Sequence, residues 1–297
     1  MRDTGGFHVV VSGIHQVAAL ARACAAAGLS RDDMGSELQR LRRVCEESPF
    51  TRHITAWPRG YPGDFEIVDY ICAQQNKAAP GTMSYWIEEY SLGTTVAQQH
   101  RNKVARQGAE IIACAETASS RHEAASIAVL ACGSSPDIAQ VQHRVAHTGA
   151  RFVVADSDAA AVQATVNRLP ALSGRIETIT GHVVRTLGQL ARRGPYDLVL
   201  AGGLFDYLSE PVAEVVVRRC IEMLRPAGRF FFTNMSPDNP YDEWIRYVCD
   251  WPLITRNEEA IRNLVMRAAG YLVDIRTERD ATRLAVLATV LHCHGPL

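Results

Sequence analysis

The sequence predicts an α/β fold in which a mostly parallel sheet of seven strands ends in an antiparallel hairpin and follows a helical N-terminal region. Residues 1–122 read as one helix after another, whereas short apolar runs alternate with helical segments after Ser119. Strands that alternate with helices form parallel βαβ units. The last two runs are joined by a short connection, and a parallel return needs a longer one. We therefore expect a helical part, residues 1–122, and a sheet domain, residues 123–297.

The helical part carries apolar residues at helical spacing in four stretches, which are Val17–Leu29, Asp32–Cys45, Phe65–Asn76 and Ser84–Gln107. Gly93 interrupts the last of these. The stretch Thr51–Gly63 is predicted to be a loop, because two prolines and two glycines crowd its second half.

The sheet domain contains seven runs with strand character, which are Ser126–Cys132, Arg151–Ala155, Arg175–Thr180, Asp197–Ala201, Gly228–Thr233, Tyr271–Glu278 and Arg283–Val290. The first run, SIAVLAC, is continuously apolar, as is typical of a parallel strand covered on both faces.

Composition excludes several classes of function. The net charge is −1, so no basic surface for nucleic acid is expected. The eight cysteines form no CxxC pair, which argues against a zinc site and a disulfide scaffold. No apolar run is expected to reach membrane-spanning length, and the N-terminus lacks the pattern of a secretory signal. We expect a cytoplasmic protein with a small-molecule partner, no metal and no membrane contact; a homodimer is left open.

A turn of small residues follows the first strand, in the sequence Ala131-Cys132-Gly133-Ser134-Ser135. Such a turn lets a ligand approach the backbone closely. Ser135 stands where many nucleotide-binding loops have a second glycine, so the pattern is not GxGxxG and a pyrophosphate ligand is disfavoured. A tight loop with no ligand would explain the turn alone equally well.

An acid ends the second strand at Asp156. It follows Gly133 at close to the ~20-residue interval expected of a carboxylate that binds the two hydroxyls of a ribose. Asp158 competes for this role and is also suited to cap the next helix. Gly133 and Asp156 together predict a nucleoside site at the carboxyl ends of the strands.

Two further strand ends carry polar residues. The third strand leads into Gly181 and His182, where a side chain would lie beside an adenine ring; a surface histidine is the alternative. The fourth strand leads into the sequence GGLFDYL. Asp206 and Tyr207 in this sequence either face the ligand or serve in capping and packing.

Three short sequence segments resemble motifs of a known family. They are PRGYPGD at Pro58–Asp64, GLFDYL at Gly203–Leu208, and MSPDNP followed by DWPLITR between Met235 and Arg256. They resemble the motifs of a bacterial group of class I methyltransferases, commonly PRGYAGD, GLFDYL, SPDNP and DWxLIYR. That group includes proteins of 3-hydroxypalmitic acid methyl ester synthesis, and the match covers most of the chain.

The resemblance implies a Rossmann-like core, S-adenosylmethionine as the methyl donor, and an N-terminal helical lid whose Gly-Tyr-Pro-Gly-Asp loop touches the cofactor pocket. Two departures limit it. Ala131 and Cys132 stand where the class often has an acid or an asparagine, and His182 replaces the usual acid of the adenine loop. The methionine contact and the acceptor are therefore not carried over.

The residues of the PRGYPGD loop support such a role. Its prolines fix φ and its glycines permit left-handed backbone, so Tyr61 and Asp64 would be held stiffly. Asp64 as the N-cap of the next helix is the alternative, and both roles are compatible. Arg59 would bind the donor's carboxylate as a forked pair.

The predicted cofactor-binding residues are Arg59, Tyr61, Asp64, Gly133, Ser134, Ser135, Asp156, Ser157, Gly181, His182, Gly202 and Leu204, and the candidate catalytic residues are Asp206, His182 and Tyr61.

The function that follows is methyl transfer from S-adenosylmethionine to a small-molecule acceptor of specialised metabolism, at oxygen, nitrogen or carbon. Aromatic or indole-type molecules and carboxylates are the acceptor classes left open. The alternatives are other chemistry on the same donor, such as cyclisation, a nicotinamide-dependent oxidoreductase, and a non-enzymatic nucleotide sensor. The missing GxGxxG counts against the oxidoreductase.

Overall fold

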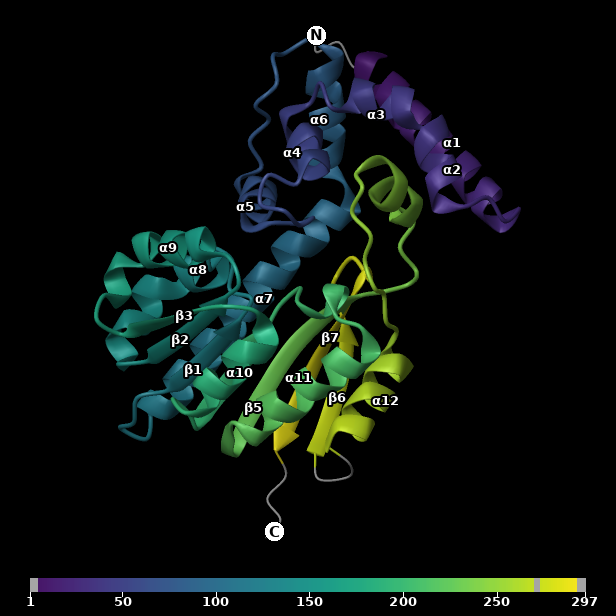
Figure 1. The fold of residues 1–297 in the computed structure, drawn as a ribbon. Coiled ribbons are helices and arrows are strands. Elements are labelled where there is room, and N and C mark those ends of the chain that lie inside the picture. Colours follow the sequence, from purple (N-terminus) through teal and green to yellow (C-terminus); the bar gives the residue numbers. More distant parts are fainter. Residues whose placement is uncertain (1–4, 270–272, 293–297) are drawn as a thin grey trace. The chain divides into compact units, whose positions relative to one another are not determined.

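The structure, a computed structural model, describes residues 5–269 and 273–292 (Figure 1). The chain forms two compact units. Unit 1 consists of Met1–Arg101 and Asp238–Leu253, and unit 2 consists of Asn102–Pro237 and Ile254–Leu297. Both units are therefore built from two separate stretches of chain. The division expected between residues 122 and 123 stays a prediction.

Unit 1 is helical. Its helices are α1 (Gly5–Ala26), α2 (Arg31–Glu37), α3 (Gln39–Cys45), α4 (Pro49–Ala56), α5 (Phe65–Ala73), α6 (Met83–Gly93) and the first residues of α7 (Thr95–Ser119). Two predicted boundaries were wrong. The stretch expected as one helix over Asp32–Cys45 is two helices that meet at Leu38. The expected loop over Thr51–Gly63 begins as helix α4, because Ser48 caps the Thr51 amide and Pro49 suits the first helical turn.

The segment Asp238–Leu253 completes unit 1 with the π-helical turn η4 (Trp244–Val248). Arg22 of α1 holds Glu243 through two hydrogen bonds, of 3.0 and 2.9 Å. Arg42 of α3 donates to the backbone oxygen of Tyr247 at 2.7 Å. The N-terminal helices thus bind a segment that lies two hundred residues later in the chain.

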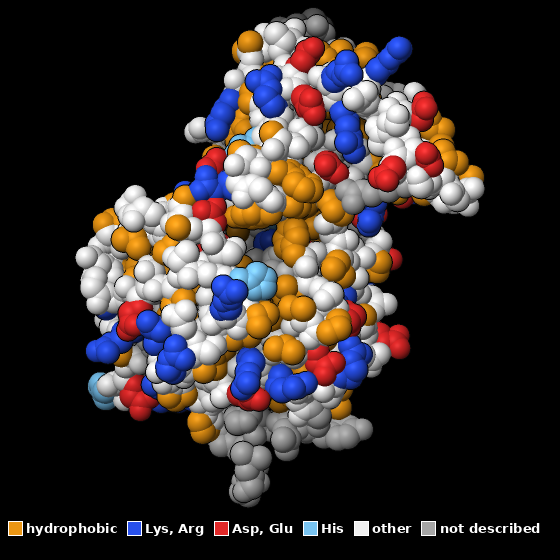
Figure 2. Space-filling model, in the orientation of Figure 1, with side chains coloured by type: hydrophobic (Ala, Val, Ile, Leu, Met, Phe, Trp, Pro, Cys, Tyr) orange, Lys and Arg blue, Asp and Glu red, His pale blue; other side chains and the backbone are white. Residues whose placement is uncertain are grey.

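Helix α1 corrects one expectation. It is long and apolar enough to cross a membrane by length and composition alone, a test that core helices and signal sequences also pass. Val10 and Ile14 are buried, whereas Val9 and Leu20 are 62% and 61% exposed. Figure 2 shows hydrophobic side chains along the edge where α1 lies in Figure 1. The expectation that no apolar run reaches spanning length was therefore wrong.

Unit 2 contains a seven-stranded sheet. Its strands are β1 (Ser126–Leu130), β2 (Arg151–Asp156), β3 (Ile176–Thr180), β4 (Tyr196–Ala201), β5 (Leu224–Met235), β6 (Val273–Arg279) and β7 (Ala285–His292). Their order is β3-β2-β1-β4-β5-β7-β6. The first five pair in parallel, and β7 runs antiparallel to both β5 and β6. The predicted fold class is confirmed; residues 271 and 272 of the predicted sixth strand lie outside the described residues.

Helices cover both faces of the sheet. They are α7, α8 (Pro136–Val145), α9 (Ala159–Arg168), α10 (Val183–Ala191), α11 (Glu210–Glu222) and α12 (Glu258–Ala269). Helices α10, α11 and α12 share one apolar cluster with Phe230 and Phe232 of β5. Helices α7 and α8 share another with Phe231, on the opposite face. Strands buried on both faces explain the continuous apolar runs of the sequence.

The strand order reverses direction between β1 and β4. Chain connections leave this point toward opposite edges of the sheet, and in open α/β sheets ligands bind at the carboxyl ends of the strands beside such a point. The turns that follow β1 and β4 are therefore adjacent, and they contain Gly133 and Gly202.

Candidate functional site

The turn after β1 has an unusual backbone. Ala131, Gly133 and Ser135 all have positive φ, at 48°, 55° and 49°. A left-handed conformation costs roughly 1–3 kcal/mol at a residue with a side chain. Thr165 of α9 offsets this cost, because its hydroxyl donates to the Gly133 oxygen at 2.9 Å and lies 3.1 Å from the Ser135 hydroxyl. Ser135 thus adopts the conformation for which nucleotide-binding loops use glycine.

Asp156 closes this turn onto β2. Its Oδ2 accepts the Gly133 amide at 2.8 Å and its Oδ1 accepts the Asp158 amide at 2.9 Å. Burial raises the pKa of Asp156, and these amides oppose the rise. The side chain of Asp158 caps α9 by accepting from Ala160. The predicted meeting of Gly133 and Asp156 is therefore present, and Asp158 is the cap.

The turn after β4 lies against helix α7. A Cβ on Gly202 would overlap the side-chain oxygen of Gln107, and a Cβ on Gly203 would lie 2.8 Å from the Lys103 Nζ. An added methyl group at either position would displace the end of the α7 side chain that it meets. Lys103 and Gln107 are one helical turn apart and are both buried, at 6% exposure. Helix α7 thus brings an ammonium and an amide to the strand ends.

Gln107 has an unsatisfied acceptor. Its Nε2 donates to Asp137 Oδ2 at 2.6 Å, and its Oε1 is buried with no hydrogen-bond partner. An unpaired buried acceptor costs about 1–3 kcal/mol unless a ligand donor reaches it. Burial raises the pKa of Asp137, which the Gln107 amide and the Lys103 charge oppose. The arrangement offers an acceptor, an acid and a cation side by side.

Asp206 lies in η3 (Phe205–Tyr207), after the β4 turn. Its Oδ1 accepts from Asn234 Nδ2 at 2.8 Å and from the Met235 amide at 2.6 Å. Burial raises the pKa of Asp206 to about 6, against the opposing charges of Lys103 and Arg256. A carboxyl with this pKa exchanges protons near neutral pH.

The remaining predicted residues of unit 2 range from buried to exposed. Ser134 is buried and its hydroxyl accepts from Arg168 at 2.9 Å. The amide of Gly181 donates to the Asp156 backbone oxygen at 2.9 Å, which ties the β3 end to the β2 end. His182 and Ser157 are exposed, and Leu204 is half-buried. The strand ends therefore gather most of the predicted residues of unit 2 at one edge.

The PRGYPGD loop belongs to unit 1. Asp64 is 2% exposed and caps α5 by accepting from Ile67 at 3.0 Å. His53 Nε2 lies 3.0 and 2.9 Å from its two carboxylate oxygens. Arg59 pairs with Glu66 at 3.2 Å, and Tyr61 is half-buried. The capping role of Asp64 is confirmed, and the cofactor roles of Arg59, Tyr61 and Asp64 stay predictions.

Three residues of the site were not predicted from the sequence: Lys103, Gln107 and Asp137. Lys103 and Gln107 recur four residues apart on a helix, a pattern also shown by solvated faces, so spacing alone does not single them out. Asp137 follows the glycine turn directly, which was an available signal. Within residues 5–269 and 273–292, no group of three or more His, Cys, Asp or Glu side chains could hold a metal ion.

Comparison with known proteins adds to this description of the fold. No protein-family model matches the sequence. No curated protein matches it significantly. Among solved structures, a possible exported protein from Bordetella parapertussis is similar at a TM-score of 0.66 and 17% identity, with 97% of each chain covered.

Two further structures have lower scores. Magnesium protoporphyrin IX methyltransferase from Synechocystis, solved with bound S-adenosylhomocysteine, has a TM-score of 0.49 at 14% identity, over 67% of this chain and 87% of that one. The pyocyanin biosynthetic protein PhzM has a TM-score of 0.49 at 15% identity, over 77% of this chain and 62% of that one. The similarity to the Bordetella protein covers 97% of each chain, and this chain shares its fold.

Proposed function

We propose that this protein transfers a methyl group from S-adenosylmethionine to a small-molecule acceptor. The observation that carries the proposal is the chemistry of the strand ends, where three buried carboxyl groups surround the glycine turns. They are Asp137, Asp156 and Asp206. S-adenosylmethionine carries a sulfonium and an ammonium against one carboxylate, so its net charge is positive. An acidic crevice at the point where the strand order reverses favours such a ligand.

The same chemistry disfavours a dinucleotide. A pyrophosphate in this fold class binds the free amides at the N-terminus of the helix after β1. Here that helix, α8, begins with Pro136, which has no amide hydrogen, and Asp137, whose Oδ1 takes the Ile138 amide at 2.9 Å. An acid in the first turn also occupies the positive end of the helix dipole. The nicotinamide alternative therefore lacks its anion site.

The residues present fit S-adenosylmethionine group by group. Each Asp156 oxygen accepts one amide and keeps capacity for a ribose hydroxyl. The unpaired Oε1 of Gln107 and the acid of Asp137 suit the donor's ammonium, and Lys103 suits its carboxylate. The donor thereby satisfies the acceptor that the protein alone leaves unpaired.

The donor, when bound, supplies a methyl group already activated by the positive sulfur. The protein's part is to hold the donor and acceptor in line and to exclude water. Gln107 and Asp156 hold the two ends of the donor. An acceptor that must lose a proton would pass it to Asp206, the side chain placed next to the β4 turn with a pKa of about 6. His182 and Tyr61 are the further candidates for this proton transfer.

Further parts of the proposal concern the surroundings of the site. We infer that the PRGYPGD loop, with Arg59, Tyr61 and Asp64, contributes to the cofactor pocket as a lid, in line with the resemblance of its sequence. The acceptor is proposed to be a specialised metabolite, methylated at oxygen, nitrogen or carbon, and the protein to act in the cytoplasm as a monomer or homodimer.

Ligand binding tests the proposal directly. S-adenosylmethionine or S-adenosylhomocysteine at 100 times its dissociation constant should stabilise the protein by about 2.7 kcal/mol. Thermal unfolding with each ligand, and with NAD as the matched control, measures this. Stabilisation by NAD without stabilisation by either adenosyl compound would overturn the proposal. Release of methylthioadenosine in place of S-adenosylhomocysteine would replace methyl transfer by cyclisation.

A further inference from the structure

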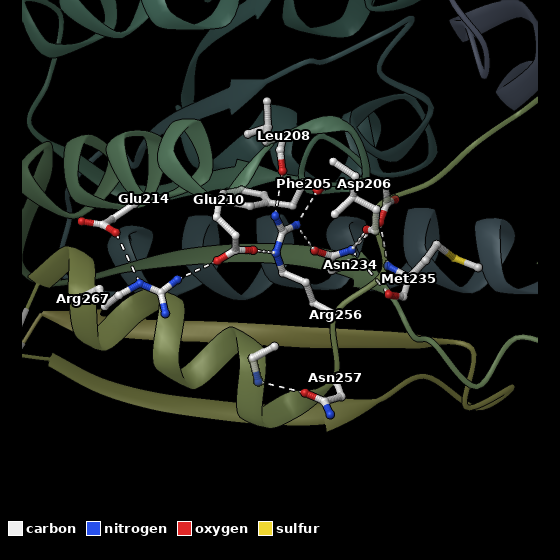
Figure 3. Close-up of polar contacts among 12 residues, drawn as sticks. Phe205, Asp206, Leu208, Glu210, Glu214, Asn234, Met235, Arg256, Asn257 and Arg267 are labelled. Carbon is white, nitrogen blue, oxygen red and sulfur yellow. Dashed lines mark hydrogen bonds and ion pairs between the residues drawn. The ribbon is translucent and has the colours of Figure 1, made fainter.

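A buried arginine connects the segment after the β4 turn to the end of β5. Arg256 is 3% exposed, and its guanidinium donates four hydrogen bonds (Figure 3). The acceptors are Glu210 Oε1 at 2.6 Å, Phe205 O at 2.8 Å, Leu208 O at 2.7 Å and Asn234 Oδ1 at 2.8 Å. Two of the acceptors are backbone oxygens that flank Asp206 in the sequence. The arginine therefore grips the turn η3 on both sides of that carboxyl group.

The side chain of Asn234 transmits this contact to Asp206. Its Oδ1 accepts from Arg256, and its Nδ2 donates to Asp206 Oδ1 at 2.8 Å and to Ile254 O at 2.7 Å. A guanidinium has donors only, so it fixes which end of the amide faces it. The NH₂ end must then face Asp206. The Ile254 oxygen holds the NH₂ end of the same amide, so Arg256 fixes the amide from its oxygen end.

The backbone of the segment around Arg256 adds to the same grip. The Arg256 amide donates to Met235 O at 2.9 Å, and the Ile254 amide donates to Asp206 O at 2.8 Å. The Asp206 carboxyl and its backbone oxygen are thus both held from one short segment. Burying a charged guanidinium is costly unless every donor has a strong acceptor.

We propose that Arg256 is a positioning residue for Asp206, which it orients by holding the amide of Asn234 and the backbone oxygens of Phe205 and Leu208. The inference rests on the proposed function in assigning Asp206 to the reaction. The charged groups that face the Asp206 carboxyl are Lys103 of α7 and Arg256 itself. Both favour the ionised form, so loss of Arg256 leaves Lys103 alone to oppose the effect of burial.

The chain supplies a matched control in Arg267. This arginine pairs with Glu210 at 2.6 Å, as Arg256 does, but it is half exposed and donates to Glu210 and Glu214 on α11 (Figure 3). Arg256→Met and Arg267→Met each remove one cation from the same glutamate. Only the first removes the contact with Asn234.

The experiment is a titration of the Asp206 carboxyl in the full chain, followed by NMR with ¹³C-labelled aspartate and assigned through Asp206→Asn. Arg256→Met should raise the measured pKa by about one unit or more, and Arg267→Met should leave it unchanged. The pH at which donor binding is half-maximal should move upward in parallel. Equal titration of Asp206 in the wild type and in Arg256→Met would overturn the inference.

A second variant covers the case in which Arg256→Met does not fold. Arg256→Lys keeps the positive charge but loses the forked donors of the guanidinium. It should therefore shift the pKa of Asp206 when Asn234 is present, and cause no further shift in a protein that already carries Asn234→Ala. Additive shifts would show that Arg256 acts by another route. The NMR readout needs no donor. A protein that binds no S-adenosylmethionine but shows the Arg256 effect therefore refutes only the proposed function.

Discussion

Asp206 combines full burial with a raised pKa. Burial raises the pKa to about 6, whereas an unperturbed aspartate titrates near about 3.9. The folded protein therefore binds this proton more tightly than the unfolded chain does. The stability that the proton contributes is fully present below about pH 4 and is lost as the pH rises through about 6.

Asp206→Asn should remove the loss of stability at higher pH, because the amide keeps an acceptor oxygen for the Met235 amide and carries no charge. We expect equal stability of variant and wild type at pH 4, and a variant more stable by roughly 3 kcal/mol at pH 7.5. Chemical unfolding at the two pH values measures the difference. A wild type that is the more stable protein at pH 7.5 would show that the ionised carboxylate is stabilising here.

Asp156→Ala should weaken donor binding roughly 10- to 100-fold, which corresponds to ~1.5–3 kcal/mol for hydrogen bonds to a charged acceptor. Asp158→Ala is the control, since it removes the α9 cap and should cost about 1 kcal/mol of stability. Isothermal calorimetry with S-adenosylhomocysteine compares the two. Equal affinities would move the ribose contact away from Asp156.

Among the site residues, those that belong to a short sequence pattern could be predicted from the sequence. Gly133 and Asp156 were predictable because a glycine turn and an acid occur at the ends of consecutive strands, and the parallel sheet brings those ends together. Arg256 was not predictable as a positioning group. Two of its acceptors are backbone oxygens, which any residue possesses, so no sequence pattern reports them.

At the scale of elements, the strands were more predictable than the N-terminal helices. Strands buried on both faces are continuous apolar runs, and their short length distinguishes them from buried helices. The start of α4 was missed because the prolines and glycines at its end outweighed the capping serine and Pro49 at its beginning. The break between α6 and α7 was correctly suspected near Gly93, and it lies at Thr94.

Contact between α7 and the β4 turn leads to a third prediction. Gly202→Ala should displace the Gln107 side chain, since the new methyl group would overlap its oxygen, and should thereby weaken donor binding. Gly188→Ala in α10 is the matched control: its nearest neighbour is 3.9 Å away, and it should stabilise the protein by about 0.5–1 kcal/mol. Calorimetry and thermal unfolding of both variants test this. A Gly202→Ala protein with wild-type donor affinity would argue against a ligand contact at Gln107.

At the scale of the whole molecule, the two units interleave along the chain. Local patterns cannot predict this, because the contacts of Arg22 with Glu243 and of Arg42 with Tyr247 join stretches far apart in the sequence. Deleting residues 1–50 removes both arginines. We expect the segment Asp238–Leu253 to become sensitive to proteases, while unit 2 keeps its own core.

Limited proteolysis with mass spectrometry measures this fourth prediction. Full-length protein with Arg22→Ala and Arg42→Ala should show an intermediate rate of cleavage in the same segment. Cleavage within the strands of unit 2 at the same rate as in Asp238–Leu253 would show that the units are not independently stable.

The interleaving of the two units also determines when the protein can fold during synthesis. Unit 1 is incomplete until its second stretch, Asp238–Leu253, has been made. The sheet of unit 2 is incomplete until β7 has been made, because β7 lies between β5 and β6. At ribosomal rates, the first hundred residues wait on the order of ten seconds for η4. Throughout that interval Ala21 and Met34 lack Tyr247, which completes the apolar cluster that they form with Cys24 and Leu38. Neither unit can therefore complete its fold before the chain that follows β5 has been made.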